Sequence, residues 1–326
     1  MQTRTLGKNL TVSAIGLGCM GMTHAYGAPS DEGDMLRLIS QAVDLGCTLF
    51  DTAECYTGTN PDGSTAYNEE LVGKGLRTYR DKVVIATKFG VRHTDSGLAM
   101  DSRPEVIRRS VEGSLRRLGI ECIDLYYQHR VDPEVPVEDV AGVMSDLMRE
   151  GKITHWGISE ATEEVIRKAH AVCPLTAVQN RFSMMARDYE ALFPVLEELN
   201  IGFVAFSPLA NGFLSDRYTK DSKFEKGVDF RSFMPQFTQQ GMEDNRPVLE
   251  CVRDLSQKKN ATPAQISLAW MLAKKPWIVP IPGTRKAERL TENFGAAQIS
   301  LTAEELANLD AVLNSLKPAA VYGVRR

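Results

Sequence analysis

The sequence lacks any long apolar run and carries no excess of positive charge. Among its 326 residues, 38 are lysine or arginine and 42 are aspartate or glutamate, which gives a net charge of −4. A chain with this balance has no strong positive field, so we expect no nucleic-acid partner and no binding to an anionic membrane surface. No apolar stretch of about 18 residues occurs and the N-terminus has no apolar core, so we expect neither a membrane span nor a signal peptide.

Cysteine and histidine are both scarce. The 6 cysteines include no C-x-x-C pair, and their scatter is not that of a disulfide framework or a zinc knuckle. Reduced thiols of this kind are typical of a cytoplasmic protein, and we expect that location. Four histidines have no partner at ligand spacing, so we expect no metal site and take them as structural or surface residues: His24, His93, His155 and His170.

The composition itself is that of a globular protein, with 43% hydrophobic and 25% charged residues. Eight short, nearly continuous apolar runs recur along it, as is typical of strands buried on both faces of a parallel sheet. They cover residues 12–18, 48–52, 83–88, 123–129, 153–159, 177–179, 202–207 and 277–281. Amphipathic stretches at helical spacing lie between them, for example at residues 35–43, 107–118 and 165–172.

This alternation predicts an α/β protein with one (β/α)8 TIM barrel, in which residues 1–326 form a single domain. An open, doubly wound sheet is the competing architecture. The longest interval falls between the seventh and eighth strands, where residues 210–243 show no clear periodicity. We expect this segment to be a long loop that covers a binding site.

A glycine motif follows the first predicted strand. Gly16, Gly18 and Gly21 match the G-x-G-x-x-G dinucleotide fingerprint, which also requires a helix that begins at the motif. Here the chain continues through residues 23–30, a stretch typical of a loop, so the match is weak evidence for that fold. We expect a tight turn at the mouth of the barrel whose backbone can approach a ligand.

Ionisable side chains stand at the ends of successive predicted strands. Asp51 and Tyr56 follow the second, Lys88 ends the third and His129 ends the fourth. In a barrel of this class the working residues lie at the carboxyl ends of the strands, so we expect these four side chains to meet there. A lysine ammonium beside a tyrosine lowers the pKa of the phenol, which can then donate a proton to a carbonyl oxygen. Histidine can add a second hydrogen bond, and a reduced nicotinamide must deliver the hydride.

With these four side chains at the ends of its predicted strands, the chain resembles the aldo-keto reductase superfamily. The resemblance is greatest to the bacterial and plant branch of auxin-induced-like and perakine-reductase-like proteins. The resemblance extends from Leu6 to about Leu316 and rests on specific motifs. These are F-D-T-A-E-C-Y at 50–56, A-T-K at 86–88, G-I-S-E at 157–160, V-Q-N at 178–180, S-P-L-A-N-G at 207–212 and I-P-G-T at 281–284. The resemblance implies a barrel with an N-terminal β-hairpin and extra helices. It also implies a catalytic tetrad of Asp51, Tyr56, Lys88 and His129.

The resemblance further implies NADPH or NADP+ as cofactor and a small carbonyl compound as substrate. The cofactor contacts that it implies are Gly18, Cys19, Met20, Asp51, Ser159, Glu160, Gln179, Ser207, Pro208, Leu209, Asn211, Gly212, Gly283, Thr284, Arg285, Arg289, Glu292 and Asn293. Two positions depart from the family pattern. Glu160 stands where many members have asparagine, and Gly283 stands where aldose-reductase-like members have a phosphate-binding lysine.

The segment after the eighth strand bears on the choice of nicotinamide. We place Thr284 near the N-terminus of the following helix, where free amides favour an anion. Arg285 and Arg289 are four residues apart, so we place them on one helical face as ligands for an adenosine 2′-phosphate. The alternative is a solvated basic face that binds nothing.

The sequence therefore predicts an NADPH-dependent enzyme that reduces an aldehyde or ketone to the alcohol. Two other functions remain open. One is a regulatory subunit that senses NADPH, as the potassium-channel β-subunits of the same superfamily do. The other is an aldolase that forms a Schiff base at Lys88. The substrate pocket is expected in loops at residues 22–26, 91–100, Arg130 and 210–243, and Cys55 is expected to be a small buried filler.

Overall fold

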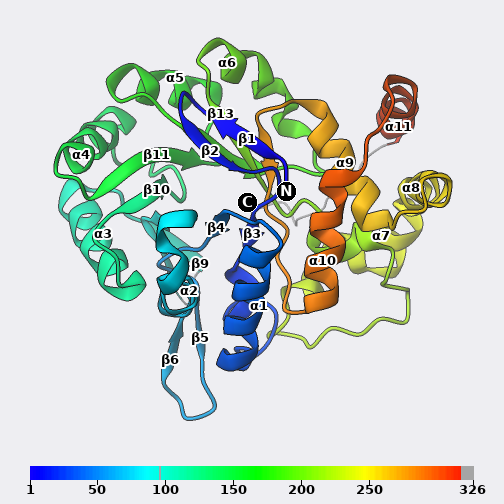
Figure 1. Cartoon of the computed structure of the whole chain (residues 1–326), viewed down its shortest axis with the longest axis horizontal. Coiled ribbons are helices and arrows are strands. Elements are labelled where there is room, and N and C mark those ends of the chain that lie inside the picture. The colour runs from blue at the N-terminus through cyan, green and yellow to red at the C-terminus, as the bar shows by residue number, and fades with distance from the viewer. Residues whose placement is uncertain (95–96, 317–326) are drawn as a thin grey trace.

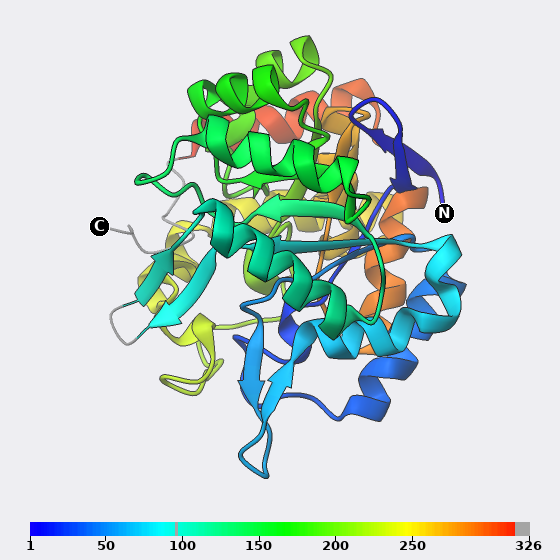
Figure 2. The same cartoon turned by 90° about the vertical axis from the view of Figure 1, so that its left-hand side faces the viewer.

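Eight parallel strands curl into the barrel of this computed structural model, which describes residues 1–94 and 97–316 (Figures 1 and 2). In the order of their neighbours they are β3 (Leu17–Gly18), β4 (Leu49–Asp51), β7 (Val84–Phe89), β10 (Ile123–Gln128), β11 (Ile153–Ser159), β12 (Ala177–Arg181), β13 (Gly202–Phe206) and β14 (Ile278–Pro280). The barrel closes between its first and last strands, because the Gly16 amide donates to the Pro280 carbonyl at 3.0 Å and the Gly18 amide donates to Pro282 at 3.4 Å.

Helices cover the outside of the barrel (Figure 1). They are α1 (Glu32–Asp44), α2 (Asn68–Leu76), α3 (Pro104–Leu118), α4 (Val137–Arg149), α5 (Glu163–Val172), α6 (Phe193–Glu198), α7 (Gln239–Asp244), α8 (Arg246–Lys259), α9 (Pro263–Lys274), α10 (Ala287–Gly295) and α11 (Ala303–Ser315). Local signals set their ends. The Asp31 side chain accepts from the Asp34 amide before α1, Thr262 and Gln265 form a capping box before α9, and Gly119 ends α3 with a φ of 65°.

One predicted strand differs from the structure. Residues 12–18 were expected to form the first barrel strand, but only β3 pairs with β4. The start of that run belongs instead to a hairpin of β1 (Thr3–Leu6) and β2 (Leu10–Ser13). Apolar runs alone cannot distinguish a hairpin strand from a barrel strand, because both bury side chains.

The β1–β2 hairpin closes the amino-terminal end of the barrel. Leu6, Leu10 and Val12 are buried and form one apolar cluster with the side chains inside the barrel, among them Leu125 and Tyr127. At this point β13 needs a glycine, because a Cβ at Gly202 would lie 2.4 Å from the Leu6 side chain. The interior is therefore a packed core below the site, as in other barrels of this class.

The glycine motif serves the closure of the barrel. A Cβ at Gly18 would lie 2.8 Å from the Ile281 carbonyl oxygen, and one at Gly16 would lie 3.0 Å from that of Leu49. The motif is followed by η1 (Met20–Met22) and a loop, and α1 begins only at Glu32. The dinucleotide fingerprint is therefore absent from this described segment, and the glycines let neighbouring strands approach closely.

Further elements surround the carboxyl end of the barrel. Two hairpins rise there, β5 (Thr57–Thr59) with β6 (Thr65–Tyr67) and β8 (Val91–Thr94) with β9 (Gly97–Met100). The segment 210–243, expected as a loop, contains short helical elements. These are η4 (Ala210–Ser215), η5 (Phe230–Phe233), η6 (Pro235–Phe237) and α7; the other such turns are η2 (Arg77–Lys82), η3 (Asp188–Leu192) and η7 (Ala296–Gln298). They are too short to show a helical period in the sequence.

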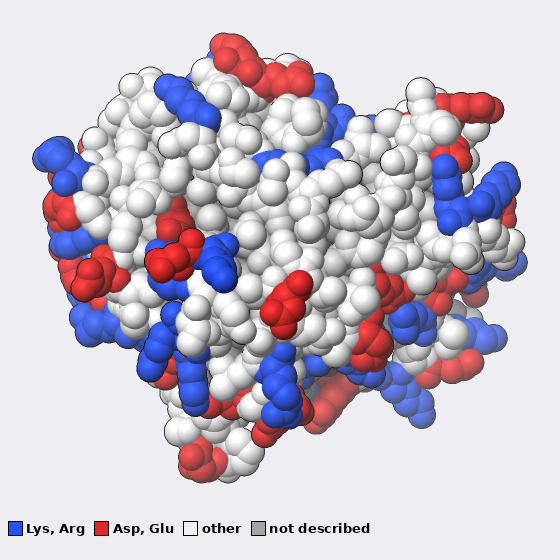
Figure 3. Space-filling model, in the orientation of Figure 1, with Lys and Arg blue, Asp and Glu red and all other residues white. Residues whose placement is uncertain are grey.

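Lysine, arginine, aspartate and glutamate side chains are intermixed around the face of the molecule that carries the β1–β2 hairpin (Figure 3). Charged side chains form ion pairs between neighbouring helices, for example Arg108 with Asp146 at 3.0 Å and Arg167 with Glu198 at 2.7 Å. Within the part of the chain that the structure describes, no helix has the length and apolar character needed to cross a bilayer.

We expect Leu6→Ala to destabilise the barrel, because it opens a cavity beneath the β1–β2 hairpin. Leu6 is fully buried, and such a truncation costs about 2–5 kcal/mol of the free energy of unfolding. Val172→Ala removes a side chain that is 47% exposed and should cost less than about 0.5 kcal/mol. Urea unfolding followed by circular dichroism measures both, and equal losses would contradict the role given to the hairpin.

Candidate active site

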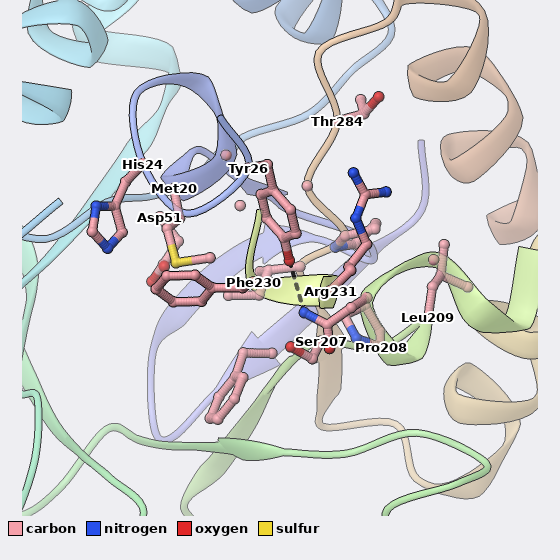
Figure 4. Close-up of a pocket in the computed structure, with 18 of the residues that line it drawn as sticks. Met20, His24, Tyr26, Asp51, Ser207, Pro208, Leu209, Phe230, Arg231 and Thr284 are labelled. Carbon is pink, nitrogen blue, oxygen red and sulfur yellow. Dashed lines mark hydrogen bonds between the residues drawn. The ribbon is translucent and has the colours of Figure 1, made fainter. Parts of the chain in front are cut away.

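A cavity of about 740 Å³ opens at the carboxyl ends of the barrel strands. Residues at or just beyond the ends of most strands line it, including Gly18, Asp51, His129, Ser159 and Gln179. Two loops complete the wall, one after β3 and one after β13 (Figure 4). A concave site in this position is where barrels of this class bind small molecules.

The Lys88 ammonium is the centre of the polar network at the floor of this cavity. It is fully buried, and its three N–H groups donate to Asp51 Oδ1 at 2.5 Å, the Thr52 carbonyl at 2.7 Å and the Tyr56 hydroxyl oxygen at 3.2 Å. An ammonium has three donors, so every one of them has an acceptor here. Asp51 is fixed in turn, because Gln179 donates to its Oδ2 at 2.7 Å.

The electrostatics of this pair keep Lys88 charged and Tyr56 protonated. Burial lowers the pKa of Lys88, but the Asp51 carboxylate and Tyr56 outweigh that effect and raise it above its ordinary value. Burial raises the pKa of Tyr56 to about 12, and the Lys88 ammonium offsets only part of the rise. The prediction that Lys88 lowers the pKa of this phenol toward neutrality is therefore wrong. The rise caused by desolvation is larger than the fall caused by one nearby ammonium.

His129 lies beside Tyr56 on the same floor. It follows β10, is 7% exposed, and its ring meets the Tyr56 ring edge-to-face with centroids 5.7 Å apart. Its Nδ1 lies 3.4 Å from the Sγ atom of Cys55. The four side chains expected from the sequence to meet at one rim are thus brought together, with Lys88 behind Asp51 and Tyr56.

Most of the cofactor contacts expected from the sequence line this cavity. They are Gly18, Met20, Asp51, Ser159, Gln179, Ser207, Pro208, Leu209, Asn211, Gly212, Gly283, Thr284, Arg285, Arg289, Glu292 and Asn293. Two others, both described residues, lie outside the lining. Cys19 is fully buried beneath the turn and its thiol donates to the Leu17 carbonyl at 3.6 Å, and Glu160 points elsewhere.

Glu160 holds a neighbouring arginine instead of facing the cavity. Its backbone has a φ of 54°, and its amide donates to Asn180 Oδ1 at 2.7 Å. Its carboxylate pairs with Arg130 Nε at 3.3 Å, and Arg130 lines the cavity. At this position the chain therefore uses a carboxylate to position a guanidinium.

The segment after β13 is held in a strained conformation. Ser207, Ala210 and Asn211 all have positive φ values of 50°, 48° and 59°, a region that residues other than glycine rarely adopt. Such strain tends to collect at ligand-binding segments, because surrounding contacts must impose it. One such contact is the hydrogen bond from the Asn211 amide to the Tyr26 hydroxyl at 2.7 Å (Figure 4).

Arg231 closes the loop after β13 against the loop after β3. It pairs with Asp229 at 2.5 Å and lies over the rings of Tyr26 at 5.2 Å and Phe224 at 4.6 Å. The backbone joins the same two loops, since the Phe230 amide donates to the Ala25 carbonyl at 3.0 Å. We call these contacts the Arg231 clasp; they place residues about 200 positions apart in sequence on one side of the cavity (Figure 4).

Of the two arginines near the clasp, Arg285 differs from expectation in its placement. Arg285 precedes α10, so it does not share a helical face with Arg289; its Nε donates to the Gly21 carbonyl and its Nη1 to Ala28 at 3.2 Å. Both arginines nevertheless line the cavity, and each has a buried nitrogen without a hydrogen-bond partner in the described structure, Nη2 of Arg285 and Nε of Arg289. Burial and the nearby Arg231 lower the pKa of Arg285, and Asp229 and Tyr26 offset part of that effect, so an anion bound here would further stabilise the charged guanidinium.

Two histidines line the cavity although the sequence pattern did not predict them there. His24 and His93 were taken as structural or surface residues, but both line the cavity with ring centroids 4.9 Å apart, and Phe230 packs edge-on against His24 at 5.8 Å. Each lies in a loop or hairpin that rises above the barrel, where no periodicity marks the direction of a side chain. The expected pocket loops at 22–26 and 91–100 were the signal that pointed to them.

Comparisons with known proteins agree with this geometry. The model of the Aldo/keto reductase family matches residues 14–314. A curated relative, "Probable aldo-keto reductase 1" from Glycine max, is 41% identical over 301 residues, which are 90% of this chain and 84% of that protein.

Solved structures are similar over almost the whole chain. The glycerol dehydrogenase AKR11B4 from Gluconobacter oxydans superposes with a TM-score of 0.86 at 28% identity, covering 99% of this chain and 98% of that one. The aldo-keto reductase AKR11C1 from Bacillus halodurans, in its holo form, gives a TM-score of 0.78 at 26% identity, covering 100% of this chain and 99% of that one. With its barrel, its buried lysine network and these matches, the chain belongs to the aldo/keto reductase family of oxidoreductases.

Proposed function

We propose that this protein reduces a small aldehyde or ketone to the alcohol with NADPH, and that Tyr56 donates the proton. The observation that carries the proposal is the contact between the Lys88 ammonium and the Tyr56 oxygen at 3.2 Å. Because Lys88 occupies a lone pair of that oxygen, the hydroxyl proton of Tyr56 must point elsewhere. The cavity that Tyr56 lines is the space in which an acceptor can meet it.

The protonation state of Tyr56 suits this role. With its pKa raised to about 12 by burial, the phenol keeps its proton at neutral pH. As negative charge develops on a carbonyl oxygen, Tyr56 can transfer that proton while Lys88 stabilises the phenolate that remains. Asp51, itself held by Gln179, keeps the ammonium in place, and His129 can orient the carbonyl by a second hydrogen bond.

The lining of the cavity fits a reduced dinucleotide phosphate, which supplies the hydride to the carbonyl carbon when bound. Ser159, Gln179 and the strained Ser207 line the same cavity as Tyr56, where they can hold a nicotinamide. Arg285 and Arg289 offer buried, unpartnered nitrogens for a phosphate, and guanidinium groups match phosphate oxygens in geometry. We therefore propose NADPH in preference to NADH.

The alternatives drawn from the sequence receive different support. A Schiff-base aldolase needs a neutral lysine that reaches its substrate. Lys88 instead has a raised pKa and is fully buried. Its three N–H groups donate to Asp51, Thr52 and Tyr56. A sensing subunit would bind the dinucleotide without turnover, and the activity measurements below distinguish it from a reductase.

We expect Tyr56→Phe to lower kcat for carbonyl reduction about 100- to 10,000-fold while the Kd for NADPH stays the same. The phenyl ring keeps the packing but lacks the hydroxyl group, and with it both the proton to be donated and the oxygen that accepts from Lys88. The measurement is the loss of reduced-nicotinamide absorbance with 4-nitrobenzaldehyde, and Tyr67→Phe, at a side chain 38% exposed, is the matched control. Full activity in Tyr56→Phe would overturn the assignment, and tight NADPH binding without turnover in the wild type would favour the sensing function.

The two directions of the reaction should depend differently on pH. Reduction needs the protonated phenol, and the raised pKa keeps that form dominant, so kcat/KM for reduction should be flat between about pH 6 and pH 9. Alcohol oxidation needs the phenolate, whose fraction grows about tenfold per pH unit below the pKa, so its kcat/KM should rise with that slope. Parallel profiles for both directions would show that another group limits proton transfer.

We expect Arg289→Ala to raise the KM for NADPH about 10- to 100-fold and to change the KM for NADH much less, because a charged hydrogen bond to the 2′-phosphate is lost. Arg246→Ala, at a side chain 74% exposed on α8, controls for the general loss of positive charge. The ratio of the two KM values is the quantity to compare. An equal increase for both cofactors would contradict a 2′-phosphate contact.

A further inference from the structure

The contact between Cys55 and His129 has no part in the mechanism described so far. Sγ of Cys55 lies 3.4 Å from Nδ1 of His129, within the reach of a hydrogen bond that involves sulfur. Both side chains are nearly buried, at 9% and 7% exposure, and both line the cavity. The thiol packs in a small apolar cluster with Ala53 and Val91.

The backbone that places Tyr56 also fixes the position of this thiol. The Glu54 amide donates to the Lys88 carbonyl at 3.2 Å, and the Tyr56 amide donates to the Ala53 carbonyl at 3.1 Å. The Glu54 carboxylate accepts from the Gly90 amide at 3.0 Å and from the Ser110 hydroxyl at 3.2 Å, which ties the turn to β7 and α3. Cys55 stands between these anchored residues, so its backbone is held beside His129 and only a rotation about the Cα–Cβ bond can displace its Sγ.

The chemistry of the two groups sets the direction of the hydrogen bond. Burial raises the pKa of Cys55 to about 12, so the sulfur carries a proton that it can donate. An unprotonated ring nitrogen is a good acceptor, whereas a thiol sulfur is a weak one. The stronger arrangement of this pair has the thiol as donor to an unprotonated Nδ1, and a neutral imidazole that accepts at Nδ1 carries its single proton on Nε2.

We propose that Cys55 is a positioning residue for carbonyl reduction, which fixes His129 in the tautomer that presents Nε2–H as a donor. This inference rests on the proposed function, because the donor matters only if His129 orients a carbonyl oxygen. In the other tautomer Nε2 would present a lone pair to that oxygen and repel it. The thiol thus acts through the imidazole and does not itself meet the substrate.

Three variants separate this role from packing. Cys55→Ser keeps a donor at the same position, Cys55→Val keeps the volume without a donor, and Cys55→Ala removes both. We expect kcat/KM for carbonyl reduction to fall about three- to ten-fold in the valine and alanine variants, the effect of one lost hydrogen bond, and to stay within about twofold of wild type in the serine variant. Cys173→Ala, which removes a buried thiol beyond the end of α5, controls for the loss of a sulfhydryl and should keep full activity.

The decisive readout is the tautomer itself. In full-length protein labelled with 15N-histidine, long-range proton–nitrogen spectra should show His129 with its proton on Nε2 in the wild type and in Cys55→Ser. The valine and alanine variants should show a mixture of both tautomers; His129→Gln identifies the signal. An Nδ1–H tautomer in the wild type, or an unchanged tautomer in both the valine and alanine variants, would overturn the inference.

This spectrum does not depend on turnover. If the wild type reduces no carbonyl compound at all, the proposed function fails, while the tautomer of His129 still decides whether the Cys55 thiol sets the protonation of the ring. If the enzyme is active and the serine variant loses as much activity as the valine variant, the loss reflects packing and the positioning role is refuted.

Discussion

A buried ammonium with all of its donors satisfied is the constraint on which the site depends. Removing a lysine from water is costly, and it is tolerated only where acceptors replace the lost hydration. Lys88 finds them in Asp51, Thr52 and Tyr56, which all lie on β4 or in the turn that follows it, while Lys88 itself lies on the adjacent strand β7. The pairing of β4 with β7 therefore sets the position of Lys88 relative to Asp51, and Lys88 in turn contacts the Tyr56 hydroxyl in the turn after β4.

The same arrangement explains which parts of the site the sequence could predict. Asp51, Lys88, His129 and Gln179 stand at or just past the ends of apolar runs, and parallel strands that close into a barrel bring such ends to one rim. Seven of the eight runs match barrel strands within about two residues. The run at 12–18 does not, because the hairpin and the barrel share one apolar stretch.

What the sequence could not predict are contacts between loops. The Arg231 clasp joins residues about 200 positions apart, and neither loop carries a period that would indicate a partner. Arg285 was placed on a helical face by its spacing from Arg289, but α10 begins only at Ala287, so its side chain turns back to Gly21. The net rise of the Tyr56 pKa was equally beyond a reading of residue types, since it depends on how completely the barrel excludes water from the phenol.

The β1–β2 hairpin at the amino-terminal end of the barrel affects the side from which a ligand can reach the cavity. Leu6, Leu10 and Val12 of the hairpin pack against the side chains inside the barrel and fill its amino-terminal end. Among the described residues, the cavity above this core opens at the carboxyl ends of the strands, beside the Arg231 clasp. A ligand bound near the rim of this cavity would therefore cover whatever is bound deeper in it.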